Sequence, residues 1–120
     1  MRNMSFSMTT EAVRRREKTV TRRLGWWDLK PGTILQAVEK AQGLKKGEHV
    51  KPICLIRVVS VTRESLDRIC IADWPGHYPD ETAREGFPQL TGIGFRNMFM
   101  RANACVSWQD VNRIEFEYLP

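Results

Sequence analysis

The chain has 120 residues, 42% of them apolar and 28% charged, which is the ordinary composition of a globular protein and predicts a single domain over residues 1–120. A chain of this length buries roughly 65% of the surface that its unfolded form exposes, so it needs no disulfide or metal to fold. The formal net charge is +5, but residues 1–63 hold 14 Lys/Arg against 5 Asp/Glu, while residues 64–120 hold 5 against 9.

Short strands and one short helix are expected in the N-terminal half. The strand patterns cover residues 4–8, 19–23 and 33–39. A hydroxyl N-cap at Thr9 or Thr10 begins a basic helix between the first two strands. Gly25 ends the second strand, and a Pro-Gly turn precedes the third.

The strongest strand pattern covers residues 53–62, where apolar side chains occupy both alternating faces, as in a central strand covered on both sides. Residues 73–82 contain two prolines and a glycine, which predicts the longest loop. In the last strand, Ile114, Phe116 and Tyr118 alternate with charged residues, which predicts one buried face and one exposed face.

A helix is predicted after Thr91, because Phe95, Met98, Phe99 and Ala102 recur at the i, i+3, i+4, i+7 spacing of one apolar face. Short strands interrupted by a few helices are typical of the α+β class. We expect the strands to form a small, mostly antiparallel β-barrel with flanking helices.

No apolar run reaches the about 20 residues that cross a bilayer, and the first residues lack the apolar segment and cleavage site of a signal peptide. Three widely spaced cysteines without a C-x-x-C pair fit reduced thiols better than disulfides or a zinc site. We therefore expect a cytoplasmic protein without membrane contact. The sequence leaves the oligomeric state open between a monomer and a weak dimer.

Basic residues cluster at the end of the first predicted helix and in the following strand. Six occur in ten positions, opposed there only by Glu17: Arg14, Arg15, Arg16, Lys18, Arg22 and Arg23. Such a concentration attracts phosphate, so a nucleic acid is the first partner to consider. The alternative is a solvated helix end whose arginines offset the helix dipole.

The same segment carries a candidate nucleophile. Side chains alternate along an ideal strand, so Lys18 and Thr21 would point to opposite faces. They meet only if Lys18 lies before the strand, where its flexible stem can turn. A lysine whose pKa is lowered by burial and nearby arginines can then deprotonate a threonine hydroxyl for acyl transfer. The alternative is that Thr19 and Thr21 serve β propensity and that Lys18 is a surface charge.

Glu85 and two tryptophans are further candidates. Glu85 lies beside Gly86, at a loop or helix end, where a carboxylate can face a cleft and shuttle protons; the alternative is a surface ion pair with Arg84. Trp26 and Trp27 follow the basic strand and offer a stacking surface for a base, although one Trp of an adjacent pair commonly packs into the core.

Four segments together resemble the ASCH domain family, in order along nearly the whole chain: residues 17–23, 30–32, 83–87 and 112–118. The family signature has a Gly two residues before a Lys and an Arg five residues after that Lys. Lys18 and Arg23 match this signature, and Arg16 stands at the Gly position. The resemblance implies a PUA-like fold, which is a small β-barrel with flanking helices.

Small bacterial ASCH proteins similar to this chain include amidohydrolases that remove the acetyl group of N(4)-acetylcytidine. The resemblance implies that Lys18 activates Thr21 as the nucleophile, that Glu85 handles protons, and that no metal or organic cofactor takes part. The substrate-binding candidates that complete this site are Thr19, Arg23, Trp26, Trp27 and Glu39.

Other ASCH domains are linked to RNA, so the alternative function is an RNA-binding module or a metal-assisted single-stranded ribonuclease that uses the same basic cleft. The excess of cations favours this alternative, because a free nucleoside carries no phosphate. The Lys-x-x-Thr pattern and Glu85 favour the hydrolase, since a binding protein needs no nucleophile. The expected partner is therefore a nucleoside substrate or RNA.

Overall fold

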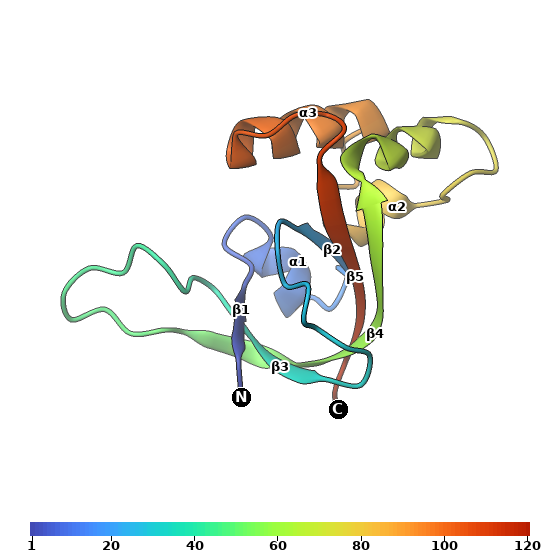
Figure 1. The fold of residues 1–120 in the computed structure, drawn as a ribbon. Helices are drawn as coiled ribbons and strands as arrows, with labels where there is room; N and C mark the ends of the chain where they lie inside the picture. Colours follow the sequence, from blue (N-terminus) through green and yellow to red (C-terminus); the bar gives the residue numbers. More distant parts are fainter.

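A five-stranded mixed sheet, in the order β1-β3-β4-β5-β2, is the centre of the computed structural model, which describes residues 1–120 (Figure 1). Its strands are β1 (Asn3–Ser5), β2 (Val20–Arg23), β3 (Ile34–Val38), β4 (Pro52–Ser65) and β5 (Asp110–Tyr118). The β1–β3 pairing is parallel, and the β3–β4, β4–β5 and β2–β5 pairings are antiparallel. The α+β class and the mostly antiparallel sheet are confirmed.

The helices are short and lie in two groups. They are α1 (Thr10–Arg14), the 3-10 helix η1 (Leu66–Asp73), α2 (Glu81–Arg84) and α3 (Gly92–Asn103). Helices η1, α2 and α3 gather at one end of the long strands β4 and β5, and α1 lies beside β1 and β2 (Figure 1). As predicted, α3 begins after Thr91, whose hydroxyl accepts the Gly94 N–H at 3.0 Å.

The sheet is open, so the expected closed barrel is wrong. Strands β1 and β2 are its two edges and do not pair with each other. Both are very short, so neither offers a backbone ladder long enough to close the sheet. The side chain of Arg23 spans the gap instead and donates to the carbonyl of Ser5 at 2.6 Å.

Two apolar clusters hold the fold together. The larger one lies inside the curved sheet and consists of Met4, Phe6, Val13, Leu29, Leu35, Ala37, Ile56, Val58, Ile114 and Phe116. The smaller one lies under α3 and consists of Leu66, Ile69, Phe95, Phe99 and Val111. In β5, Ile114 and Phe116 are buried as predicted, but the predicted exposed face is wrong at Arg113, which is buried because it bonds to Glu81.

Strand β4 is central in the sheet, as predicted, but it is covered on one face only. Leu55 and Val59 are exposed, because no second layer packs against the outer face of the sheet. The pairing register with β5 shifts between Val58 and Ser60, where the strand carries a bulge. The sequence pattern therefore indicated a strand correctly and its surroundings incorrectly.

The longest connection is not the predicted one. Because η1 extends to Asp73 and α2 begins at Glu81, only residues 74–80 remain as a loop between them. The connection between β3 and β4, over residues 39–51, is longer and extends away from the body of the protein (Figure 1). Its turn residues indicated where the chain reverses, but not how far the strands on either side continue.

Candidate active site

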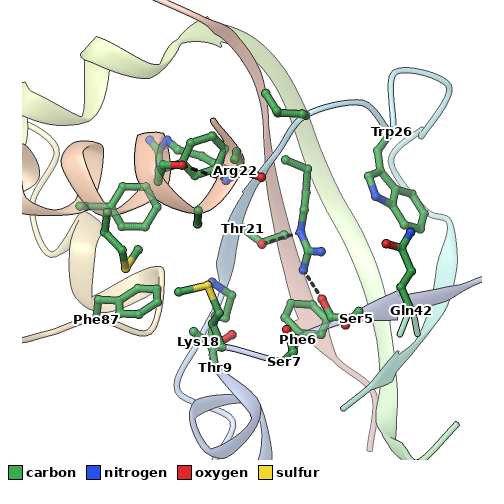
Figure 2. Close-up of a pocket in the computed structure, with 18 residues that line it drawn as sticks. Ser5, Phe6, Ser7, Thr9, Lys18, Thr21, Arg22, Trp26, Gln42 and Phe87 are labelled. Atoms are coloured by element: carbon green, nitrogen blue, oxygen red, sulfur yellow. Dashed lines mark hydrogen bonds between the residues drawn. The ribbon is translucent and has the colours of Figure 1, made fainter. Parts of the chain in front are cut away.

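A cavity of about 600 Å³ lies next to the open edge of the sheet (Figure 2). Most of its wall comes from three segments that are distant in sequence: the end of β1 with the following loop, the segment of residues 18–26 that contains β2, and α3. Gln42 and Phe87 complete the wall. The charged or hydroxyl side chains on these walls are Ser5, Ser7, Thr9, Lys18, Thr21, Arg22 and Arg23. The failure of the sheet to close therefore creates the site.

Lys18 enters this cavity because it lies before β2, which begins at Val20. The turn that brings it there passes through Arg16, whose φ of 60° is in the left-handed region that favours glycine. Arg16 is the residue at the Gly position of the ASCH signature, so the turn keeps its left-handed backbone without the glycine. Lys18 therefore lies before the strand, as it must if it is to share a site with Thr21.

Glu85 holds the Lys18 amine in place. Nζ of Lys18 lies 3.0 Å from Oε1 of Glu85 and also donates to the backbone carbonyl of Glu85. Both side chains are almost fully buried, with 3% and 2% of their surface exposed. Glu85 follows α2 and does not line the cavity itself, so it acts on the site through Lys18.

Thr21 lies in β2 opposite Ile114 and presents its hydroxyl to the same cavity (Figure 2). Its Oγ1 accepts a hydrogen bond from Nε of Arg23 at 3.0 Å. Since the oxygen is the acceptor here, the hydroxyl proton remains free to be donated. A base in the cavity therefore has a proton to take, and the guanidinium stabilises the negative charge that develops on the oxygen.

Arg22 forms the centre of a buried network of charges that the sequence analysis did not predict. Its Nη1 lies 2.9 Å from Oε2 of Glu85, and its Nη2 lies 2.6 Å from Oε2 of Glu81 and 3.1 Å from Oε2 of Glu64. Arg113 donates to both oxygens of Glu81, at 2.7 and 3.0 Å. The network links β2, β4, β5 and α2 behind the cavity and fixes the carboxylate that holds Lys18.

These surroundings shift the pKa values of the cavity cations. Burial lowers the pKa of Lys18, the Arg23 and Arg22 guanidiniums lower it further, and Glu85 opposes the shift. Burial lowers the pKa of Arg23 to about 10. Arg22 is also buried, but the carboxylates of Glu85, Glu81 and Glu64 raise its pKa. The lowered pKa of Lys18 favours its neutral amine, which is the form that a general base needs.

The remaining predicted site residues divide into two groups. Arg23 and Trp26 line the cavity. The hydroxyl of Thr19 instead accepts from Nε of Arg84 at 3.1 Å, outside the cavity wall. The guanidinium carbon of Arg63 lies 4.2 Å from the centroid of the Trp27 ring. Oε2 of Glu39 forms an ion pair with Nη2 of Arg14 at 3.1 Å. The structure does not bring Thr19, Trp27 or Glu39 into the cavity.

The basic cluster between positions 14 and 23 does not form one exposed patch. Lys18, Arg22 and Arg23 point inward and bond within the protein. Arg14 and Arg15 form ion pairs with glutamates, and Arg16 donates to the carbonyl of Leu119. Three of the six cations are therefore held inside the protein, and Arg14, Arg15 and Arg16 remain exposed.

No group of three or more His, Cys, Asp or Glu side chains is arranged to hold a metal ion. No helix is both long and apolar enough to pass through a membrane.

Comparison with known proteins places the fold. No family model matches the chain, and no curated protein sequence does. The structure is similar to the crystal structure of an ASCH domain from Lactobacillus crispatus JV V101, with a TM-score of 0.58 and 17% sequence identity. The similarity covers 98% of this chain and 79% of that one. The chain therefore has the fold of an ASCH domain, which confirms the resemblance at the level of the fold.

Proposed function

We propose that this chain is an ASCH amidohydrolase that removes the acyl group from N(4)-acetylcytidine or related N(4)-acylated cytosine nucleosides. The observation that carries the proposal is the meeting of Lys18 and Thr21 in one cavity, with Glu85 fixing the lysine from behind. These are the residue types, at the sequence positions, that the ASCH resemblance implies for this reaction.

The geometry around Lys18 supports a role as base. A neutral amine has two N–H groups and one lone pair. Glu85 accepts from Nζ through its carboxylate and its backbone carbonyl, so it can occupy both N–H groups of the neutral amine. The lone pair is then left for the Thr21 proton. When Lys18 takes that proton, the nearby Glu85 carboxylate stabilises the ammonium.

The reaction proceeds in two stages. Oγ1 of Thr21 attacks the acyl carbon while Lys18 takes its proton, and the carbonyl oxygen becomes an oxyanion that the Arg23 guanidinium can stabilise. The C–N bond then breaks, and Lys18 gives its proton to the leaving amine of cytidine. Water, deprotonated by Lys18, then attacks the Thr21 ester. The bond from the acyl carbon to Oγ1 breaks, Lys18 returns the proton to Oγ1, and the carboxylic acid leaves. Glu85 acts in both stages by holding Lys18.

Cytidine release from N(4)-acetylcytidine, followed by its ultraviolet spectrum, tests the proposal. We expect turnover by the wild type and its loss in Lys18→Ala and in Thr21→Val, which keeps the shape of threonine. Thr19→Val is the matched control, because this hydroxyl lies outside the cavity, and it should keep its activity. Turnover that survives in Thr21→Val would exclude Thr21 as the nucleophile.

RNA binding is the second candidate, favoured by the loop of residues 39–51. The exposed lysines of this loop are Lys40, Lys45, Lys46 and Lys51. Lys40 also lines a pocket of about 420 Å³ that shares Ser5, Arg23 and Trp26 with the main cavity. Binding of labelled single-stranded RNA that weakens steeply with salt, in a folded protein without amidohydrolase activity, would favour this candidate.

A further inference from the structure

Lys18 and Thr21 divide the cavity into two parts of different chemistry. Phe87 lies on one side of them, and Trp26 and Gln42 lie on the other (Figure 2). An amide substrate also has two unlike sides, the acyl group and the amine, which meet at the carbonyl carbon that is attacked. Because the nucleophile lies between the two parts of the cavity, the acyl group must lie in one part and the amine in the other.

The first part, here named the apolar lobe, consists of Phe87, Phe95, Met98 and Phe99. Phe87 and Met98 are half-buried and present most of its surface, while Phe95 and Phe99 are buried behind them, with ring centroids 5.8 Å (Phe87–Phe95) and 6.1 Å (Phe95–Phe99) apart. The lobe begins directly at the base, because Nζ of Lys18 is 6.0 Å from the Phe87 ring centroid. None of its four side chains carries a hydrogen-bonding group suited to a nucleobase edge.

The second part, here named the polar lobe, consists of Ser5, Ser7, Arg23, Trp26 and Gln42. The adjoining pocket of about 420 Å³ is lined by all five of these residues, so this side has room for a larger group. Hydroxyl, amide and guanidinium groups can bond to the ring and sugar of a nucleoside, and an indole offers it apolar surface. The polar lobe therefore suits the cytidine side of the amide.

We infer that the apolar lobe receives the acyl group and that this protein prefers N(4)-acyl cytidines whose acyl group is larger and more apolar than acetyl. The inference rests on the function proposed above and specifies its substrate class. An acetyl methyl group covers little of the surface that the Phe87 ring and the Met98 thioether present to the cavity. Each further methylene that is buried there contributes about fourfold to binding, so a hexanoyl group gains over an acetyl group.

The test compares kcat/KM for N(4)-acetylcytidine and N(4)-hexanoylcytidine. We expect the hexanoyl compound to be hydrolysed with a kcat/KM about tenfold or more higher. Met98→Gln keeps the length of the side chain but makes the lobe polar, and it should lower this ratio. Arg101→Gln is the matched control, because Arg101 lies on the same helix, is exposed and does not line the cavity, so the ratio should stay as in the wild type.

Binding of N(4)-hexylcytidine, which has no amide to hydrolyse, is measured in parallel against cytidine by calorimetry. Hydrolysis of both acyl compounds without a hexanoyl preference overturns the inference and leaves the proposed function standing. If neither acyl compound is hydrolysed, the proposed function is overturned. Binding of hexylcytidine about tenfold tighter than cytidine, with this gain lost in Met98→Gln, would then still support binding of an alkyl group in the apolar lobe. If there is no hydrolysis and hexylcytidine binds no tighter than cytidine, the inference and the proposed function are both overturned.

Discussion

Nη2 of Arg23 lies 2.6 Å from the carbonyl oxygen of Ser5, across the gap that the sheet leaves between β2 and β1. Nε of the same guanidinium donates to Oγ1 of Thr21 at 3.0 Å. The guanidinium carbon also lies 4.9 Å from the centroid of the Phe6 ring. One planar side chain thus joins the two sheet edges and orients the candidate nucleophile.

Arg23→Lys is expected to reduce hydrolysis much more than it reduces stability. A lysine keeps the charge, but its donors all lie on one nitrogen and cannot replace Nε and Nη2, which reach Thr21 and Ser5 from two different positions. We expect kcat/KM for N(4)-acetylcytidine to fall about 10²-fold, as when one oxyanion donor is lost, with a melting temperature within a few degrees of the wild type. Arg15→Lys, at an exposed ion pair with Glu17, is the control. Full activity of Arg23→Lys would show that the guanidinium is dispensable.

The pH dependence of hydrolysis is expected to show the lowered pKa of Lys18. Burial, with help from Arg23 and Arg22, places that pKa below the ordinary 10.5 of lysine, against the influence of Glu85. A base works in its neutral form, so kcat/KM should rise with pH through this pKa, and the midpoint of the rise should lie below pH 10.5. Lys18→Arg stays protonated over the whole range and should lose about 10²–10⁴-fold. The measurement is a pH–rate profile of both proteins.

A third variant separates this pH effect from a general loss of activity. Arg23→Gln removes one of the cations that lower the pKa of Lys18, so the rising part of the profile should move to higher pH. The position of that rise is independent of how much total activity the variant keeps. A rise at the same pH in wild type and Arg23→Gln would contradict the assignment of this pKa to Lys18.

Local patterns predicted the elements that position the site. Strand β2, strand β5 and helix α3 follow from alternation or helical spacing within about ten residues, and each lies where the sequence placed it. Closure of the sheet was predicted wrongly, because it depends on whether two edge strands meet across the whole molecule. The left-handed backbone at Arg16, which lets Lys18 turn towards Thr21, carries no signal in the residue itself.

The sequence analysis did not predict the buried charged network around Arg22, although the charge distribution along the chain contained a sign of it. Two of its cations, Lys18 and Arg22, come from the basic first half of the chain, and Glu64, Glu81 and Glu85 come from the acidic second half. The unequal charge of the two halves therefore indicates, in part, ion pairs between them. The sequence could not show which charges pair, because their partners are 42 to 67 residues apart.

Glu81→Gln is expected to destabilise the fold strongly. The Glu81 carboxylate is buried and accepts from both Arg22 and Arg113, so its neutral replacement leaves two buried cations with fewer partners. Loss of one member of such a pair costs about 3–5 kcal/mol in the free energy of unfolding. Glu117→Gln, which breaks an ion pair with Arg57 that is about half exposed, should cost less than about 1 kcal/mol. Urea titrations of the three proteins measure both values, and equal costs would contradict the network.

The contribution of the Glu81 carboxylate to the free energy of unfolding should decrease in acid. Burial favours the neutral carboxyl, but Arg113 and Arg22 outweigh it and lower the pKa of Glu81 below its ordinary 4.5. A carboxyl with a lowered pKa stabilises the fold fully above pH 4.5, and this stabilisation is lost as the pH falls through the folded-state pKa. The protonated Glu81 of the wild type then resembles the amide of Glu81→Gln. The difference in unfolding free energy between the two proteins should therefore be constant near pH 7 and narrow in acid, as far as both remain folded. Other carboxyls titrate alike in both proteins and cancel, so a difference that stays constant into acid would show that Glu81 is not held ionised by these arginines.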